Sequence, residues 1–291
     1  MKIAVLGSRG QLGRDLVSRS AGQAVVPLTR TEIDLAKPDT IPALLASVKP
    51  DVLVNCAAYN FVDQAETEPD AAMAVNAWGV RALAAACRDA NVKLVHFSTD
   101  YVFGLDSSRT RPFAETDAPG PVSVYGISKL AGEYAVLAAD PRHLVIRTCG
   151  LYGVWGSGGK GGNFVETMLK LAASGKPLKV VNDQFCTPSY TGDVADATIG
   201  MIRDGLSGLF HVTNEGAVSW HDFAAGIFEV AGVKADLSPT TSEEFKRPAK
   251  RPPYSVLSNA KLVAAGVPAP RPWREALQAY VEERKSQSIS R

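Results

Sequence analysis

The chain is poor in cysteine and carries almost no net charge. Its four cysteines are widely scattered and form no CxxC pair; they are Cys56, Cys87, Cys149 and Cys186. This spacing argues against a disulfide scaffold and favours buried free thiols. The four histidines show no metal spacing either, so we predict no metal site. A formal net charge of +1 provides no field that would attract nucleic acid or an anionic membrane.

Long apolar runs and targeting signals are also missing. No uninterrupted apolar run approaches the roughly 20 residues of a membrane-spanning helix. Met1-Lys2 leads directly into 3–6, a run shorter than the apolar region of a signal peptide and without its cleavage site. We therefore expect a cytoplasmic protein that binds neither nucleic acid nor membrane.

What the sequence does contain is an alternation of short apolar runs and helix-like segments. This alternation is typical of a parallel sheet with helices on both faces. The expected strands are 3–6, 24–28, 52–55, 94–97 and 144–146, and the expected helices are 11–20, 40–48, 70–91, 164–174, 191–203, 219–231 and 273–284. We predict an α/β fold, with a Rossmann-like doubly wound parallel sheet and a smaller, mixed α/β C-terminal substrate domain.

The composition changes after Thr148. Residues 150–162 contain seven glycines in thirteen positions, and prolines cluster at 248–253 and 268–272. Such segments are typical of loops over a smaller domain. We expect a dinucleotide-binding domain of residues 1–149 plus roughly 190–213, and a substrate-binding domain of roughly 150–189 plus 214–291.

A glycine turn follows the first expected strand with the spacing GxxGxxG. Its residues are Gly7, Arg9, Gly10, Gln11, Leu12 and Gly13. Backbone N–H groups at such a turn, with the dipole of the following helix, bind a phosphate, and the last glycine lets helix and strand approach closely. A tight strand-to-helix connection is the alternative. In this context we predict a nucleotide site.

The end of the second expected strand indicates which dinucleotide would bind. An acidic residue there would contact the ribose 2′-hydroxyl of NAD. This chain has Thr29-Arg30 instead, and Arg30 could join Arg9 around a 2′-phosphate. Asp34, with Leu35 beside it, could still contact the adenine end. We predict NADPH as the cofactor, with NADH as the alternative.

A tyrosine and a lysine stand four residues apart in the run from Tyr125 to Lys129. On a helix that begins near Val124, these positions share one face and lie about 5 to 6 Å apart. A phenol with a pKa near 10 is too weak an acid for neutral pH, but an adjacent positive charge lowers this pKa. We predict that Lys129 tunes Tyr125 as a general acid. A chance pair on a helix is the alternative.

Several motifs together resemble the extended short-chain dehydrogenase/reductases. They are the GxxGxxG turn, 55–58 (Asn-Cys-Ala-Ala), 98–103 (Ser-Thr-Asp-Tyr-Val-Phe) and the YxxxK run at 125–129. More narrowly, the chain resembles the dTDP-4-dehydrorhamnose reductase family from Met1 to about Tyr280. This narrower resemblance is carried by 62–66, 98–103, 163–164, 182–185, 251–252, Ser255 and Leu257.

The resemblance implies reduction of the C4 ketone of dTDP-4-dehydro-L-rhamnose to dTDP-L-rhamnose. Thr99 would bind the substrate carbonyl, Tyr125 would protonate its oxygen, and Lys129 would hold the nicotinamide ribose and tune the tyrosine. Related sugar-nucleotide dehydratases carry a Thr-Asp-Glu run, but here Tyr101 replaces the glutamate, which favours reduction over elimination of water. The alternative role for the Thr99 hydroxyl is to satisfy the local backbone.

Other binding residues are implied around this centre. The cofactor's ribose and pyrophosphate would pass beside Cys56, Ala57, Ala58 and Tyr59. The substrate would contact Thr99, Asp100, Tyr101, Tyr125, Gly150, Asn163 and Arg251. Arg251 and Lys250 are expected to clamp its pyrophosphate, although Lys250 is almost equally well explained as a solvated base.

Three polar residues have two interpretations each. Asn76 resembles an asparagine that the family places beside the active site, and a backbone-bonded asparagine is the alternative. Asp63 and Glu66 match a run of the family and would shape a loop or face the substrate. The alternative is that both Asp63 and Glu66 are surface charges.

Two features depart from the reductase family. Where the family has Trp in a Ser-Trp-x-Tyr run, this chain reads Cys-Gly-Leu-Tyr at 149–152. We hypothesise that Trp155 folds back to replace this missing wall of the substrate pocket. Some members form dimers around a magnesium ion held by glutamates. Asp15 and Asp193 stand in roughly matching places but are shorter by a methylene, so we do not expect a magnesium-bridged dimer, and a homodimer of another kind stays open.

Two other functions also stay open. The altered pocket wall would suit a reductase or epimerase of another nucleotide sugar. A non-catalytic NADP-binding regulatory subunit, like the beta subunit of methionine adenosyltransferase, has a similar fold. Intact Thr99, Tyr125 and Lys129 argue against the regulatory function.

Overall fold

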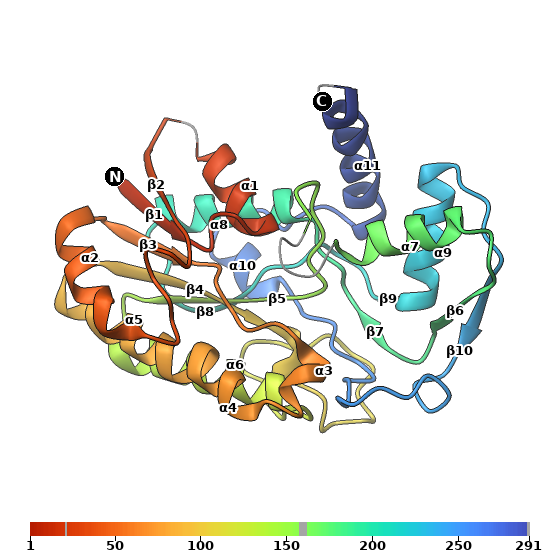
Figure 1. Ribbon diagram of the computed structural model, residues 1–291, viewed down its shortest axis with the longest axis horizontal. Coiled ribbons are helices and arrows are strands. Elements are labelled where there is room, and N and C mark those ends of the chain that lie inside the picture. Colours follow the sequence, from red (N-terminus) through yellow and green to blue (C-terminus); the bar gives the residue numbers. More distant parts are fainter. Residues whose placement is uncertain (21, 157–161, 290–291) are drawn as a thin grey trace.

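The fold is organised around a six-stranded parallel sheet (Figure 1). The computed structural model describes residues 1–20, 22–156 and 162–289. In sheet order the strands are β2 (Ala24–Leu28), β1 (Lys2–Leu6), β3 (Val52–Asn55), β4 (Lys93–Thr99), β5 (Leu144–Thr148) and β8 (Gly208–His211). The predicted doubly wound parallel sheet is confirmed. The strand order reverses between β1 and β3, and open α/β sheets bind ligands at the carboxyl ends of strands around such a point.

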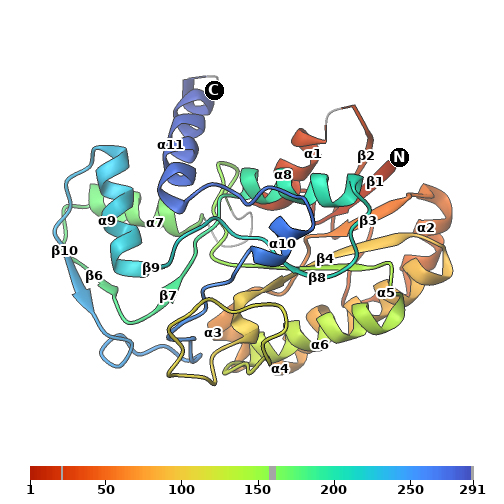
Figure 2. The same cartoon turned by 180° about the vertical axis from the view of Figure 1, so that it is seen from behind.

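Strand β1 shows why helices cover both faces of the sheet. Ile3 and Val5 pack into one buried cluster, whereas Ala4 and Leu6 pack into the other. A strand alternates its side chains with a period of two, so an unbroken apolar run needs a cover on each face. The helices are α1 (Gln11–Arg19) and α8 (Thr191–Arg203) on one face, and α2 (Ile41–Val48), α5 (Val80–Asp89) and α6 (Val124–Ala139) on the other (Figures 1 and 2).

The helix predicted over 70–91 is interrupted by a π-helical turn. Its parts are α4 (Pro69–Met73), the turn η2 (Ala74–Gly79) and α5. Asn76 lies in this turn and is fully buried. Its amide accepts a hydrogen bond from Tyr59 N at 2.9 Å and donates to Tyr59 O at 2.8 Å and to Ser128 Oγ at 3.0 Å. Asn76 therefore ties the loop after β3 to α6, as its backbone-bonded interpretation predicts.

Close helix packing continues beside this turn. A Cβ on Gly132 of α6 would lie 2.2 Å from Asn76 O, so only glycine permits this approach. Glu66, just after α3 (Val62–Ala65), accepts from Val124 N at 2.9 Å. This carboxylate satisfies a free N–H in the first turn of α6, which agrees with the loop-shaping interpretation of Glu66.

A smaller lobe stands beside the carboxyl ends of the strands (Figures 1 and 2). Its own buried cluster includes Tyr152, Phe223 and Tyr280. Strand β6 pairs in parallel with β10, and β7 pairs antiparallel with β9. The elements are α7 (Phe164–Ala173), β6 (Leu178–Val181), β7 (Phe185–Cys186), β9 (Val218–Ser219), α9 (Trp220–Ala231), β10 (Leu237–Thr240) and α11 (Trp273–Ile289). Strands this short carry too little pattern to be predicted from sequence.

The chain crosses between the two lobes more than once. Helix α8 and strand β8 return to the large sheet, and so does α10 (Ala260–Ala264), whose Leu262 packs in the core of the sheet. The predicted domain limits stay a prediction. Of the predicted glycine-rich loop, residues 157–161 lie outside the described residues. Across the described part of the chain, no helix combines the length and apolar character that a membrane span requires.

Candidate active site

The glycine turn joins β1 to α1 with its backbone packed too tightly for side chains. Gly7 has a φ of +79°, and a Cβ there would lie 2.8 Å from Ala57 N. A Cβ at Gly13 would lie 2.3 Å from Gly7 O. Helix α1 begins at its N-cap, Gly10, without a side-chain cap and without an acidic residue in its first turn. Its N-terminal N–H groups and its dipole are therefore suited to an anion.

A cavity of about 490 Å³ lies against this turn. Its walls bring together the predicted cofactor residues Gly7, Arg9, Gly10, Gln11, Leu12, Gly13, Cys56, Ala57, Ala58 and Lys129. Sequence reasoning missed Ser98 and Thr148, which also line it at the carboxyl ends of β4 and β5. Among the described residues, neither Ser98 Oγ nor Thr148 Oγ1 has a hydrogen-bond partner, although both atoms are buried. Buried hydroxyls are normally bonded, so the cavity fits a polar ligand such as a dinucleotide.

Arg30 and Asp34 lie outside the walls of this cavity. Arg30 Nη2 pairs with Asp34 Oδ2 at 3.1 Å, and the Arg30 side chain is 80% exposed. The structure pairs Arg30 with an acid four residues along the chain, and the expectation that Arg30 joins Arg9 around a 2′-phosphate stays a prediction. Of Arg9 and Arg30, Arg9 lines the cavity and Arg30 does not.

Leu35 and Tyr59 also lie outside the cavity walls. Leu35 is buried, and its carbonyl oxygen lies only 2.1 Å from where a Cβ on Gly79 would stand. The backbone of Tyr59 is held by Asn76, and its hydroxyl donates to Glu68 Oε2 at 3.2 Å. Their expected contacts with the cofactor stay predictions.

Tyr125 and Lys129 line the cavity from successive turns of α6. The helix begins at Val124 because Ser123 caps it, with Ser123 Oγ accepting from Gly126 N at 3.2 Å. Lys129 Nζ donates to Phe97 O of β4 at 2.6 Å. Tyr125 also lines the adjoining cavity together with Thr99. The structure thus brings the three predicted catalytic side chains to one place.

Burial dominates the acidity of these groups. Burial raises the pKa of the Tyr125 phenol, and the hydrogen bond with Thr99 lowers it by less. Burial also lowers the pKa of Lys129 to about 8. The prediction that Lys129 brings the Tyr125 pKa down is therefore wrong for this structure: burial is the largest influence and raises that pKa, and the Lys129 ammonium is bonded to the Phe97 carbonyl.

The structure shows the local-backbone role considered for Thr99, while its role at the substrate carbonyl stays a prediction. Its Oγ1 accepts from Tyr101 N at 3.2 Å, which satisfies the local backbone. Its hydroxyl also bonds Asp100 Oδ1 at 3.1 Å. Asp100 is buried behind the cavities, where its other carboxylate oxygen accepts from Ser255 Oγ at 2.6 Å and Cys149 Sγ at 3.1 Å. Asp100 therefore holds Thr99 in place and lines none of the cavities described here.

Two further cavities continue from this centre. One, of about 600 Å³, is lined by Thr99, Tyr125, Gly150 and Asn163. The next, of about 270 Å³, is lined by Tyr101, Arg251, Met168 and Trp220. Phe164 and Arg247 line both, so the two spaces adjoin. Lys250, the second predicted clamp, is exposed and lines neither.

An aromatic wall is present, but Trp155 does not provide it. Trp155 Nε1 donates to Asp15 Oδ1 at 2.9 Å, so its indole is turned to α1. The hypothesis that Trp155 replaces the missing tryptophan is wrong. Trp220 stands nearest instead, since a Cβ on Gly150 would lie 3.1 Å from its ring. Trp220 packs on Phe164 with the ring centroids 4.7 Å apart. Trp220 follows β9, a strand that forms only by long-range pairing, so no local pattern in the sequence predicted its position.

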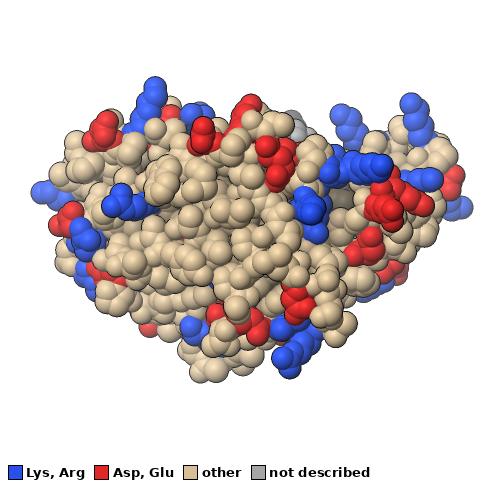
Figure 3. Space-filling view, turned by 90° about the horizontal axis from the view of Figure 1, so that it is seen from below, with Lys and Arg blue, Asp and Glu red and all other residues tan. Residues whose placement is uncertain are grey.

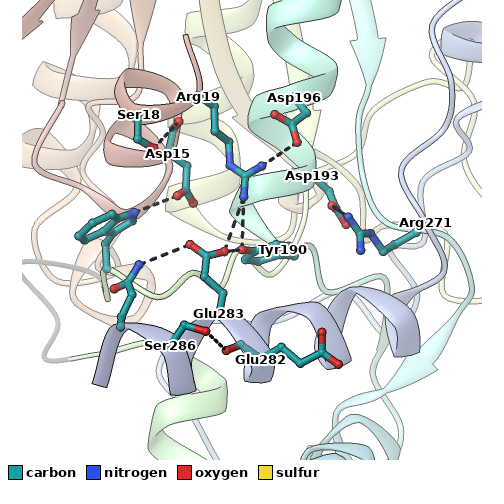
Figure 4. Close-up of polar contacts among 12 residues, drawn as sticks. Asp15, Ser18, Arg19, Tyr190, Asp193, Asp196, Arg271, Glu282, Glu283 and Ser286 are labelled. Atoms are coloured by element: carbon teal, nitrogen blue, oxygen red, sulfur yellow. Dashed lines mark hydrogen bonds and ion pairs between the residues drawn. The ribbon is translucent and has the colours of Figure 1, made fainter. Parts of the chain in front are cut away.

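Asp15 and Asp193 have different partners (Figure 4). Asp15 binds the indole of Trp155, whereas Asp193 Oδ1 pairs with Arg271 Nη2 at 2.9 Å. Between them Arg19 Nη1 pairs with Asp196 Oδ2 at 2.8 Å. Over the residues that the structure describes, no group of three or more acidic, histidine or cysteine side chains could hold a metal ion.

Comparison with known proteins identifies the family. Residues 1–286 match the family model described as RmlD substrate binding domain. A dTDP-4-dehydrorhamnose reductase of Mycolicibacterium smegmatis is 43% identical over 96% of this chain and 85% of its own. The crystal structure of a dTDP-4-dehydrorhamnose reductase of Clostridium acetobutylicum is similar with a TM-score of 0.92 at 39% identity, covering 98% of this chain and 100% of the other. That of the Bacillus anthracis enzyme, solved with NADP, has a TM-score of 0.91 at 34% identity, covering 97% and 99%.

These matches confirm the resemblance that the motifs indicated. They extend over both lobes, so the sheet with its glycine turn and the smaller lobe with its cavities belong to one family architecture. The chain belongs to the RmlD substrate-binding-domain family, alongside the dTDP-4-dehydrorhamnose reductases that it matches over nearly its whole length.

Proposed function

We propose that this protein reduces the C4 ketone of dTDP-4-dehydro-L-rhamnose to dTDP-L-rhamnose, with NADPH as cofactor. The observation that carries the proposal is the position of Tyr125, which lines both the dinucleotide cavity and the adjoining cavity that contains Thr99. An acid at this junction serves a bound cofactor and a bound ketone together. The related reductases named above support the same chemistry.

The cofactor would be held by the glycine turn and by Arg9. The N–H groups of the first turn of α1, from Gln11 to Gly13, suit the pyrophosphate, and Arg9 provides a guanidinium on the wall for a 2′-phosphate. This arrangement supports NADPH over NADH, as does the NADP complex of the Bacillus anthracis relative. Bound NADPH supplies the hydride.

Tyr125 supplies the proton. Because burial raises its pKa, the phenol keeps its proton at neutral pH. Thr99 and Tyr125 line the same substrate cavity, so both hydroxyls can contact one ketone oxygen. As negative charge grows on that oxygen, Tyr125 transfers its proton. Lys129 lines the same cavity one helical turn away and provides a positive charge beside the phenolate once the proton has left.

The sugar nucleotide would occupy the two cavities of the smaller lobe. Gly150 and Asn163 lie on the cavity of the reacting centre, and Arg251 and Arg247 supply guanidinium groups for the diphosphate. Trp220 beside Phe164 provides a flat apolar wall suited to a planar base. Tyr101 lines the same cavity, so no carboxylate at that position is available for elimination of water.

The test is NADPH consumption with dTDP-4-dehydro-L-rhamnose as substrate. Wild-type protein should oxidise NADPH rapidly, and Tyr125→Phe should lose about a hundredfold or more of kcat, the usual contribution of general acid catalysis. Tyr134→Phe, on the same helix but exposed, is the matched control and should keep full activity. No oxidation by a wild-type protein that binds NADPH would refute the proposal.

Another 4-keto sugar is the second candidate, favoured by Gly150. Where the family has tryptophan, this glycine leaves the wall to Trp220 from another element. A wall built from α9 lies at a different place and would admit a differently shaped hexose. Comparing kcat/KM for several dTDP-4-keto-6-deoxy sugars decides between them, together with the C4 configuration of each product.

A homodimer is the partner that the surface supports. The outer side of α6 carries no charge, because its charged residues, Lys129 and Glu133, are both buried. Trp78, Ile127 and Tyr134 are 61%, 50% and 56% exposed on α6 and the neighbouring η2. Figure 3 shows this side of the molecule with a broad uncharged area. Such a patch usually marks an interaction site.

We propose a second copy of the chain as the occupant of this face. Asp70 lies at one end of the α4–α5 segment and Arg81 and Arg88 lie toward the other. A two-fold antiparallel pairing would place the acidic end of one copy on the basic end of its partner. Sedimentation should show a dimer that Trp78→Glu converts to monomer. A monomeric wild type would refute the pairing.

We also propose a cytoplasmic location. All four cysteines are free thiols in the structure. Free thiols persist in a reducing compartment. Fractionation of cells that produce the protein tests this, and recovery outside the cytoplasm would contradict it.

A further inference from the structure

Asp63 connects the two lobes at the edge of the substrate cavities. It lies on α3, which follows β3 of the large sheet. Its Oδ2 pairs with Arg251 Nη2 at 3.0 Å and lies 3.8 Å from Arg247 Nη1. Its Oδ1 accepts from Ala249 N at 3.3 Å. One carboxylate therefore holds two guanidinium groups and the backbone between them.

The two arginines held by Asp63 are cavity residues. Arg251 lines the smaller cavity and Arg247 lines both. Their side chains are 19% and 50% exposed. Arg251 Nη1 also donates to Ala249 O at 3.1 Å, which fixes the direction of its guanidinium plane. A diphosphate is best recognised by such pre-oriented planar groups.

If only its charge mattered, Asp63 would weaken the binding of a diphosphate rather than support it. A carboxylate near the cavity repels a diphosphate, so removing its charge should strengthen binding if orientation had no role. Asp63 is 31% exposed, and water and salt screen this repulsion. Two long arginine side chains without their common partner would instead regain many rotamers, and two like charges would lie close together without compensation.

The state of Asp63 agrees with this role. Burial by itself would raise its pKa, but the hydrogen bond and charge of Arg251 outweigh burial and hold the pKa below its usual value. Asp63 is therefore ionised at neutral pH.

We propose that Asp63 is a positioning residue that orients Arg251 and Arg247 to bind the diphosphate of the sugar nucleotide. This inference rests on the proposed function, since it takes the diphosphate of that substrate as the ligand of the two arginines. Asp63 belongs to the 62–66 run that carries part of the family resemblance. In this proposal Asp63 does not contact the substrate itself and acts through the two arginines.

The experiment compares wild type, Asp63→Asn and Asp63→Glu by titration with dTDP and by steady-state kinetics. Asp63→Asn keeps the shape of the side chain and loses its charge. We expect dTDP to bind this variant about ten- to a hundredfold more weakly, with KM for the sugar nucleotide raised alike and kcat within about twofold. Asp63→Glu should recover part of the loss. NADPH affinity should stay unchanged in both and shows that they are folded.

A double variant distinguishes positioning from general damage. If Asp63 acts through Arg251, Asp63→Asn should add less than about threefold to the loss already caused by Arg251→Gln. Asp39→Asn, which removes an exposed charge away from the cavity walls, is the control and should bind dTDP as wild type does.

Three outcomes would overturn the inference. Unchanged or tighter dTDP binding by Asp63→Asn would show that Asp63 does not support dTDP binding by orienting the arginines. Fully additive losses in the double variant would show that Asp63 does not act through Arg251. Absence of dTDP binding by wild type would overturn the proposed function and this inference with it, whereas either of the first two outcomes leaves the proposed function standing.

Discussion

Replacing Gly13 by alanine tests whether the close contact of α1 with the glycine turn sets both stability and cofactor binding. The new Cβ would lie 2.3 Å from Gly7 O and 2.9 Å from Ser8 Cα. Both are backbone atoms, so no side chain can rotate away. To restore ordinary contact, α1 has to shift by about 1 Å from the turn.

Two effects of this substitution oppose each other. Alanine is favoured over glycine within a helix by about 0.5–1 kcal/mol. Overpacking against fixed atoms costs about 1–3 kcal/mol. The clash therefore outweighs the helix preference, and we expect a net destabilisation of about 1–2 kcal/mol. The same shift displaces the N–H groups of α1, and a misplacement of about 1 Å commonly costs up to a hundredfold, so NADPH should bind ten- to a hundredfold more weakly.

Urea unfolding and NADPH titration measure the two effects. Gly200→Ala is the matched control, because it also lies within a helix, α8, but the nearest atom to its new Cβ is 3.9 Å away. It should stabilise the protein by about 0.5–1 kcal/mol and leave NADPH binding unchanged. The reasoning is refuted by a Gly13→Ala protein that unfolds and binds NADPH like wild type.

Three other predictions concern Lys129, the Glu133–Arg147 ion pair and Trp220. Because burial lowers the pKa of Lys129 to about 8, its ammonium is present below this pH and lost above it; kcat/KM should fall above about pH 8, and Lys129→Met should lack this decline. Glu133 and Arg147 form a buried bidentate ion pair, so Glu133→Gln should cost about 3–5 kcal/mol in urea unfolding, whereas Asp89→Asn, in an exposed pair with Arg88, should change stability by less than about 1 kcal/mol. Trp220→Ala should raise KM for the sugar nucleotide by about tenfold through loss of its flat wall, and an equal effect of Trp155→Ala would contradict the assigned wall.

Much of the fold was predictable because its signals are local. Strands β1, β3, β4 and β5 are short, largely apolar runs that need burial on both faces. Helix α6 begins where Ser123 can cap it, which places Tyr125 and Lys129 on successive turns. Strands β6, β7, β8, β9 and β10 were missed because two to four residues carry too little pattern, and their existence depends on partners found in the folded chain.

The candidate site likewise has some features that the sequence predicts and others that it does not. The glycine turn and the Tyr125–Lys129 pair are determined by sequence spacing, because residues close in the chain have few possible arrangements. The pKa of Tyr125 could not be predicted in this way, because it is raised mainly by burial among residues distant in the sequence. The sequence also did not predict that Arg30 pairs with Asp34 or that Trp155 bonds Asp15.

The sequence by itself thus determined the sheet, its nucleotide-binding turn and the helix that carries the acid. Only the tertiary structure decided which charges meet and which ring forms the substrate wall. Asp63 and Arg251 belong to different lobes, and Trp220 reaches Gly150 from a separate helix. Backbone geometry restricts neighbours along the chain, whereas partners far apart in sequence are selected by the packing of the whole molecule.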